Sequence, residues 1–337
     1  GELMNTSKAL TMIMAIFVSV AIAFAVGTFV QYISRLIFTF TYNNKALKWK
    51  IGIFGGIAFT AIVYFMLIKG VGNFSFMTAD AKAWMNTHQW TICGICFVTF
   101  AILSQILYFL KISVFKVLVL AGTFALAMAF AGNDLVNFIG VPLAGFASYT
   151  DFMANGNGDY AGFMMDSLNG PAKTPVLFLV AAGTVMVISL ATSKKAFNVV
   201  KTSVDLARQD AGDEMFGSSK MARILVRFST NTAAGISELV PERVKRWINA
   251  RFNNENVVLP RGAAFDEIRA TVNLVVSSLL IALGTSLTLP LSTTYVTFMV
   301  AMGTSLADRA WGRESAVFRI TGVISVIGGW FITAGAA

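Results

Sequence analysis

The chain has few of the residues on which hydrolytic and metal-dependent enzymes rely. Its 337 residues include one histidine, His88, and two cysteines, Cys93 and Cys96. A single histidine at the mouth of an apolar run argues against a multi-histidine metal site and against a Ser-His-Asp triad. The cysteines form a CxxC inside that run, without the alternating strands and helices typical of a redox CxxC. We therefore expect no enzyme, no cofactor and no multi-ligand metal centre.

Charged residues are also scarce, at 13% of the chain against 56% hydrophobic residues. Long apolar runs cover residues 9–34, 51–68, 89–110, 117–149, 174–193, 270–289 and, with its flanks, 320–330. A helix needs about 20 apolar residues to cross about 30 Å of hydrocarbon. Barrel strands are only about 10 residues long and alternate in polarity, whereas these runs are continuous. The composition predicts an all-α, polytopic membrane protein whose surroundings are a lipid bilayer.

The basic residues gather in particular segments. The loop 41–50 contains three lysines and the segment 193–269 is rich in Lys and Arg, whereas the loop 151–172 contains three aspartates and no basic residue. The positive-inside rule places the first two segments in the cytoplasm and the acidic loop outside. We expect the plasma membrane or the bacterial inner membrane. The net charge of +9 is then explained by loops facing anionic lipid, so no nucleic-acid partner is needed.

This charge pattern divides the chain into three parts. Residues 1–192 and 270–337 form two parts of a transmembrane bundle, and residues 193–269 form a cytoplasmic, amphipathic helical insertion. Pro241 followed by Glu242 predicts a helix over 242–252, since proline suits the first helical position and an acid suits the N-terminal dipole. We expect the insertion to be a solvated connector, with a partner-binding or regulatory role as the alternative.

A first polar string interrupts the run 117–149. It reads Gly132-Asn133-Asp134-Leu135-Val136-Asn137. Asp134 is the only charged residue between positions 117 and 150, and a carboxylate at such depth is costly and marks an ion or substrate site. We predict a helix break at Gly132, with freed carbonyls and the oxygens of Asn133, Asp134 and Asn137 forming a cage for a hard cation such as Na⁺. The alternative is that Asp134 simply caps a helix.

A second polar string follows the run 270–289 and reads Pro290-Leu291-Ser292-Thr293-Thr294. Pro290 predicts that a helix restarts there, which places three hydroxyls beside the free N–H groups of a first turn. Such a terminus suits an anion. Residues 271–307 include no charged side chain, so a bound cation would have to offset repulsion between the anion and Asp134. The alternative is hydroxyls bonded to i−4 carbonyls in a kinked helix.

Together the two strings resemble the paired motifs of the inorganic phosphate transporter (PiT) family. Residues 132–140 are similar to the last nine positions of G-[AGS]-N-D-x-x-N-x-x-G and residues 290–294 to P-x-S-T-T, in the family's order, with a large cytoplasmic loop between them. The resemblance implies an inverted-repeat fold with broken or re-entrant helices and symport of inorganic phosphate with Na⁺ or H⁺. It assigns phosphate to Ser292, Thr293, Thr294 and Asn137, the cation to Asn133, Asp134 and Asn137, and helix breaks to Gly132, Gly140 and Pro290.

Two features depart from the family pattern. The family usually has histidine after Ser-Thr-Thr, whereas this chain has Tyr295, so any proton-handling or gating role of that histidine is not carried over. Family members also contain both motifs twice, and this chain contains each once. We therefore expect it to be the second half of the repeat with a preceding helix, completed by a missing first half or a second copy. The alternatives are a non-transporting fragment or scaffold subunit, and transport of sulfate or another oxyanion.

Overall fold

The computed structural model of the chain describes residues 6–40, 48–66, 78–156, 158, 162–164, 174–209, 217–224, 226–227, 240–253, 263–287, 289 and 291–336. All regular secondary structure in these ranges is helical, which confirms the predicted all-α class. The helices are α1 (Thr6–Phe38), α2 (Lys48–Val63), α3 (Ala79–Thr87), α4 (Gln89–Phe109), α5 (Val114–Asn155), α6 (Val176–Thr192), α7 (Lys194–Leu206), α9 (Glu242–Arg251), α10 (Glu267–Ser286), α11 (Thr293–Ala307) and α12 (Arg313–Ala336).

Within the described ranges, five helices are long and apolar enough to cross a membrane. They are Ile13–Phe38, Trp49–Met66, Gln89–Phe109, Val114–Asn155 and Glu267–Ser286. A sixth span results if α6 and α7, which are bent by 64° relative to one another, cross together. The predicted run 320–330 lies in α12, whose apolar stretch is Ser315–Gly329. The chain therefore has the helices of a polytopic membrane protein.

Polar residues just before the apolar runs determine where several helices begin. The Ser113 hydroxyl accepts a hydrogen bond from the backbone N–H of Lys116 at the start of α5. The Asp266 carboxylate accepts one from the N–H of Arg269 at the start of α10. Each cap satisfies a backbone donor that the first helical turn leaves free, which matters most where little water is present.

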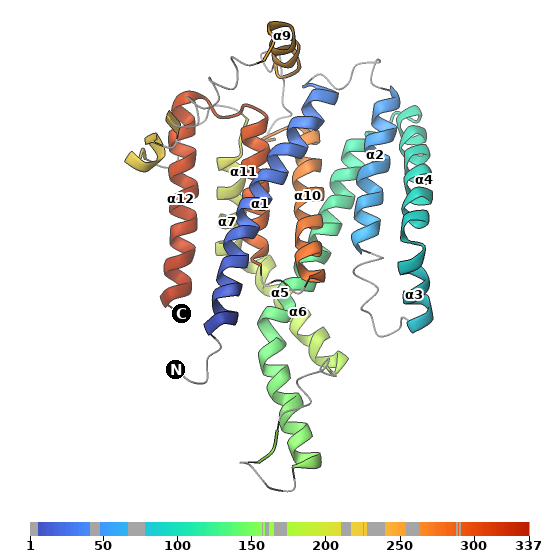
Figure 1. The fold of residues 1–337 in the computed structure, drawn as a ribbon, viewed down its shortest axis with the longest axis vertical. Coiled ribbons are helices and arrows are strands. Elements are labelled where there is room, and N and C mark those ends of the chain that lie inside the picture. Colours follow the sequence, from blue (N-terminus) through green and yellow to red (C-terminus); the bar gives the residue numbers. More distant parts are fainter. Residues whose placement is uncertain are drawn as a thin grey trace.

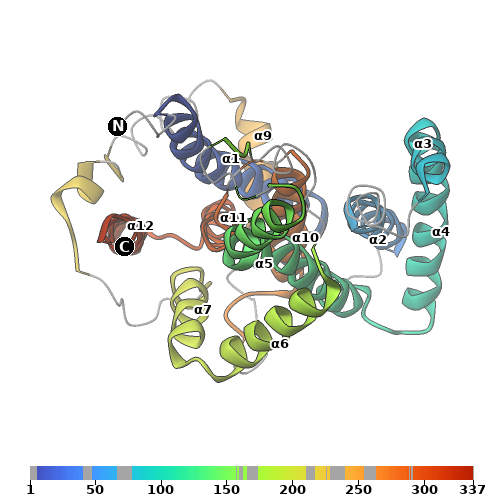
Figure 2. The same cartoon turned by 90° about the horizontal axis from the view of Figure 1, so that it is seen from below.

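Helices approach one another most closely where one of them has a glycine at the contact. A Cβ on Gly27 of α1 would lie 2.9 Å from the carbonyl oxygen of Val300 on α11, and one on Gly303 of α11 would overlap the carbonyl of Phe24. Small residues allow helix backbones to approach in this way. Figures 1 and 2 show α1 crossing α11, with α5 beside α10 and α2 beside α4 on one flank. The bundle is therefore centred on α1, α5, α10 and α11.

Helices α10 and α11 form a hairpin inside this bundle. α10 ends at Ser286 and α11 begins at Thr293, so the chain turns at the second polar string, close to where the sequence predicts a restart. Pro290 itself lies outside the described residues. Gly284 allows the turn to fold back against α10, because a Cβ there would overlap the side chain of Leu291. The turn is thus packed against its own helix.

Helix α5 is continuous through the first polar string, so the predicted helix breaks at Gly132 and Gly140 are wrong. A Cβ on Gly132 would meet no atom within 4 Å, so no close approach demands an opened backbone. Asn133 and Asp134 form hydrogen bonds with the α10–α11 hairpin instead, and α5 stays a continuous helix. A helix of 42 residues is about 63 Å long, twice the hydrocarbon thickness of about 30 Å. Its second half extends beyond the rest of the bundle (Figure 1).

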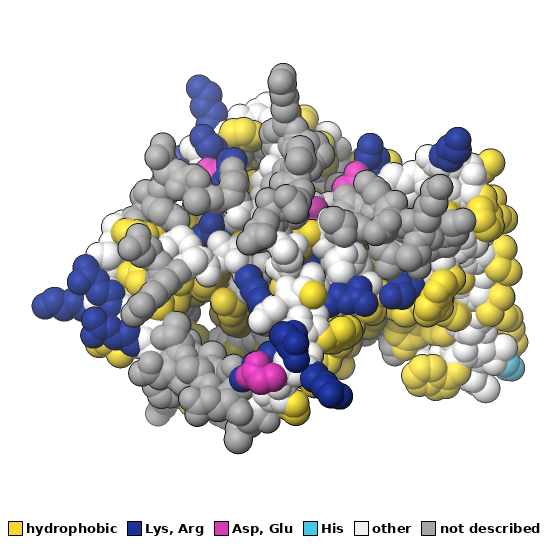
Figure 3. Space-filling model, turned by 90° about the horizontal axis from the view of Figure 1, so that it is seen from above, with side chains coloured by type: hydrophobic (Ala, Val, Ile, Leu, Met, Phe, Trp, Pro, Cys, Tyr) yellow, Lys and Arg dark blue, Asp and Glu magenta, His cyan; other side chains and the backbone are white. Residues whose placement is uncertain are grey.

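Basic side chains gather at one end of the bundle (Figure 3). Many Lys and Arg side chains gather on the face seen in Figure 3, where α9 lies across the end of the bundle. α5 begins near that face and ends at the opposite side, just beyond Asp151 (Figure 1). By the positive-inside rule the face in Figure 3 would lie toward the cytoplasm, and this orientation stays a prediction.

The described parts of the predicted insertion 193–269 are attached to the bundle at both ends. The N–H of Gln209 donates to the carbonyl of Ala264 at 2.9 Å, which brings the two ends together. Arg319 of α12 donates to the carbonyl of Arg208 at 2.9 Å. The predicted helix over 242–252 is confirmed as α9, and much of the rest of the insertion lies outside the described residues.

Candidate functional site

The two polar strings meet in the structure. The Thr293 hydroxyl, at the first residue of α11, lies 2.9 Å from Oδ1 and 3.0 Å from Oδ2 of Asp134, near the middle of α5. These residues are 159 positions apart in the sequence. Thr293 is buried, at 3% exposure, whereas Asp134 is half-buried. The contact therefore forms between a carboxylate on one helix and a helix N-terminus on another.

Asn133 adds a second link between α5 and the hairpin. Its Nδ2 donates to the carbonyl oxygen of Leu291 at 3.4 Å and to Oδ1 of Asp134 at 3.1 Å. Its Oδ1 accepts from the Thr285 hydroxyl at 3.4 Å. Because Asn133 is buried, at 8% exposure, these bonds replace the water that its amide would otherwise require. The amide therefore bridges both arms of the hairpin.

The N-terminus of α11 provides the electrostatic basis of the site. Ser292 caps this helix by accepting the N–H of Tyr295 at 3.4 Å. The free N–H groups of the first turn carry partial positive charge and stabilise a nearby anion. In this structure the anion at that end is the carboxylate of Asp134. The cluster of Asn133, Asp134, Thr285, Leu291 and Thr293 is called the tip cluster below, because it lies at the turn of the α10–α11 hairpin.

Other residues assigned from the sequence have different positions. Asn137 follows Asn133 by one helical turn but its side chain is exposed. Thr294 is half-buried in the first turn of α11, and the Ser292 hydroxyl serves the helix cap. Of the predicted residues, the structure thus brings Asn133, Asp134 and Thr293 into direct contact.

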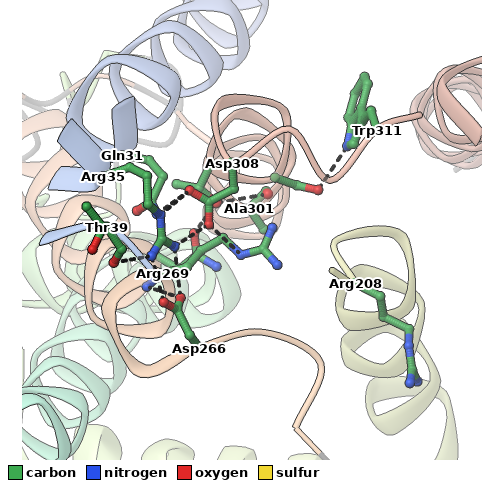
Figure 4. A network of polar contacts seen from close by, with 12 residues as sticks. Gln31, Arg35, Thr39, Arg208, Asp266, Arg269, Ala301, Asp308 and Trp311 are labelled. Carbon is green, nitrogen blue, oxygen red and sulfur yellow. Dashed lines mark hydrogen bonds and ion pairs between the residues drawn. The ribbon is translucent and has the colours of Figure 1, made fainter. Parts of the chain in front are cut away.

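A second polar cluster, which sequence reasoning missed, lies at the other end of the same hairpin (Figure 4). Arg35 of α1 lies between two carboxylates and is fully buried. Its Nη1 and Nη2 donate to Asp266 at 2.8 and 3.1 Å, and its Nε and Nη2 donate to Asp308 at 2.9 and 2.6 Å. Gln31 donates to Asp308 at 2.8 Å, and the buried Arg269 lies beside it. These five residues are called the base cluster.

The base cluster joins three helices at the end of the bundle that lies opposite the tip cluster (Figure 1). Asp266 caps the start of α10, Asp308 follows the end of α11, and Arg35 is in the last turn of α1. In the sequence each looks like an ordinary charged residue flanking an apolar run, which usually extends toward water. Only the packing of α1 against the hairpin shows that they are buried.

Comparisons of this chain with family models, with curated proteins and with solved structures found no match. The functional assignment therefore depends on the two polar strings and on the geometry of the tip cluster.

Proposed function

We propose that this chain carries half of the binding site of a secondary active symporter that moves inorganic phosphate with Na⁺ or H⁺. The observation that carries the proposal is the Thr293–Asp134 contact, because it unites two polar strings that are far apart in the sequence but adjacent in an apolar bundle. The resemblance of both strings to the PiT motifs supports the same function. A missing first half or a second copy of the chain would complete the site.

The tip cluster and the residues next to it offer two kinds of polar group, one suited to a cation and one suited to an anion. Asp134 and Asn133 offer carboxylate and amide oxygens, which suit a hard cation. The first turn of α11, with Ser292, Thr293 and Thr294, offers hydroxyl and backbone donors, which suit a tetrahedral oxyanion. Asn137, one turn further along α5, is within the same polar string and would join either ion once the site is complete. Rocking of one bundle half against the other would then expose both ions alternately to each side.

The hydroxyl of Thr293 provides a physical reason for coupling. A threonine hydroxyl has a single proton to donate, and here Asp134 accepts it. An anion arriving at the N-terminus of α11 would lose this donor and would face the carboxylate charge. A cation bound to Asp134 offsets that charge and releases the Thr293 proton, so each ion raises the affinity for the other by the same factor.

Uptake of labelled phosphate into liposomes containing the purified protein tests the proposal. Asp134→Asn keeps the size of the side chain and removes its charge, so we expect phosphate to bind without regard to Na⁺ and Na⁺-driven uptake to be lost. Thr293→Val should weaken phosphate binding, whereas Thr293→Ser should retain it. Thr297→Val is a matched control, since among the described residues that hydroxyl donates only to backbone carbonyls of its own helix. Full Na⁺-dependent uptake by the Asp134→Asn protein would refute the cation role.

Two alternatives give different results in related assays. A scaffold subunit, suggested by the single copy of each string, would show no phosphate-dependent rise in thermal stability across millimolar phosphate with Na⁺, because only a ligand of the native state stabilises it. A transporter of sulfate would have its phosphate uptake displaced by sulfate at lower concentration than by unlabelled phosphate. Competition in the liposome assay therefore separates the two oxyanions.

A further inference from the structure

The guanidinium of Arg269 is buried without hydrogen-bond acceptors among the described residues. Its side chain is fully buried near the start of α10, and Nε, Nη1 and Nη2 make no hydrogen bond with any described residue. The nearest carboxylate oxygen of an ion-pair partner is Oδ2 of Asp308, 3.6 Å from Nε. The ring of Phe265 lies 4.9 Å from the guanidinium carbon. A buried guanidinium that has donors but no acceptor is strongly unfavourable.

Arg35 uses most of the acceptor capacity of the two carboxylates in the base cluster. Oδ1 of Asp308 accepts from Gln31 and from Arg35, and Oδ2 accepts from Arg35 at 2.6 Å. Both oxygens of Asp266 also accept from Arg35, and its Oδ1 accepts the backbone N–H of Arg269 as well. Arg35 is therefore fully paired, whereas the guanidinium of Arg269 has an ion pair with Asp308 and no hydrogen bond with any described residue.

We propose that the guanidinium of Arg269 binds a small inorganic oxyanion at the base of the α10–α11 hairpin. A guanidinium presents its N–H groups as a planar fork that matches two oxygens of a phosphate-like ion. Such an ion supplies acceptors for the Arg269 donors that make no hydrogen bond with a described residue. Because Arg269 has no exposed surface, the ion is enclosed by the cluster and enters when the base of the hairpin opens.

The proposed anion site is distinct from the tip cluster. The two clusters lie at opposite ends of α10, a helix of 20 residues that is about 30 Å long. The base cluster is at the end of the bundle that the charge pattern assigns to the cytoplasm (Figures 1 and 4). The choice of phosphate as the ion rests on the proposed function, whereas the need for an acceptor at Arg269 does not.

The test uses the whole chain in nanodiscs made of phosphatidylcholine alone, so that no anionic lipid is present. Thermal unfolding is followed while phosphate replaces gluconate at constant ionic strength. Thr293→Val is the background, since it weakens the proposed anion site at the tip. We expect the melting temperature of this variant to rise saturably with phosphate, and we expect Arg269→Met in the same background to abolish the rise. Arg309→Met, which removes an exposed arginine near the same end, should retain it.

Each outcome decides between the two sites. A phosphate-dependent rise that Thr293→Val removes entirely would support the tip site and overturn the site at Arg269. A rise that survives Arg269→Met would also overturn it. So would an Arg269→Met variant whose melting temperature exceeds that of the background by the same amount in gluconate and in phosphate, since the guanidinium would then have no bound ion. If phosphatidylglycerol raises stability in place of phosphate, a lipid headgroup is the occupant and the proposal fails. Should Arg269→Met not fold, Arg269→Lys, which lacks the fork, should raise the half-saturating phosphate concentration.

Discussion

Replacement of Arg35 by methionine should destabilise the protein more than any other single change in the base cluster. The side chain makes two hydrogen bonds to each of two buried carboxylates and one to the carbonyl of Thr39 at 3.1 Å. Methionine preserves much of the volume but leaves Asp266 and Asp308 without their main counter-ion. Removing one partner of a buried ion pair costs about 3–5 kcal/mol. Arg269 lies 3.6 Å from Asp308 and can offset part of this loss, so we expect about 3 kcal/mol, the lower end of that range.

Unfolding by sodium dodecyl sulfate in mixed micelles, followed by tryptophan fluorescence, measures this free energy. Arg309→Met is the matched control and should change stability by no more than about 1 kcal/mol, because this exposed arginine contacts only Asn249 and the ring of Phe252 among the contacts found in the described part of the chain. Adding Asp308→Asn to Arg35→Met should recover part of the loss, because the unpaired charge is removed together with its partner. A cost of Arg35→Met below about 1 kcal/mol, comparable to that of an exposed ion pair, would refute the argument that the network holds α1 to the hairpin.

Further substitutions test the packing and the helix starts, each read out as a shift in thermal melting of the purified protein. Gly303→Ala should destabilise the protein by about 1–3 kcal/mol, since its Cβ would overlap the carbonyl of Phe24. Gly94→Ala is the control, because a Cβ there meets no atom within 4 Å. Equal melting temperatures of the two variants would contradict the close contact at Gly303. Ser113→Ala removes the cap of α5 and a hydrogen bond to Glu267 and should cost about 1 kcal/mol, an effect that Ser113→Thr, which keeps the hydroxyl, should not show. Phe38→Ala empties a fully buried position and should cost about 3–5 kcal/mol, and a loss below about 1 kcal/mol would show that the surrounding rings collapse into the space.

The apolar runs made much of the architecture predictable from the sequence. A run that must satisfy its own backbone in lipid has little choice but to be helical, so the helices appear where hydropathy places them. The start of α9 was equally predictable, because proline and an acid at Pro241 and Glu242 act locally. The two polar strings could be recognised as partners only through the motif resemblance, since nothing in the spacing of Asp134 and Thr293 predicts their contact.

Two features of the structure could not be read from the sequence. The predicted break at Gly132 assumed that polar groups in lipid must be met by an opened backbone. In the structure Asn133 and Asp134 instead form hydrogen bonds with side chains and a backbone carbonyl of the α10–α11 hairpin. These contacts depend on tertiary packing. The burial of Arg35 and Arg269 likewise depends on how α1 crosses the hairpin. Local signals at a helix end cannot distinguish a buried arginine from one that reaches water.

The identity of residue 134 bears on whether the tip cluster is structural or functional. Thr293 could donate its proton equally well to the amide oxygen of an asparagine, so the hydrogen bond to Asp134 gives no reason for a charge. The helix N-terminus beside it favours a negative group only modestly, by about 0.3–2 kcal/mol, whereas an ionised side chain in a membrane protein costs about 2.5 kcal/mol or more. A purely structural contact would therefore be better served by the neutral amide. A ligand that requires the negative charge, such as a coupling cation, accounts for the carboxylate, and this is why Asp134→Asn is the most informative substitution at the proposed site.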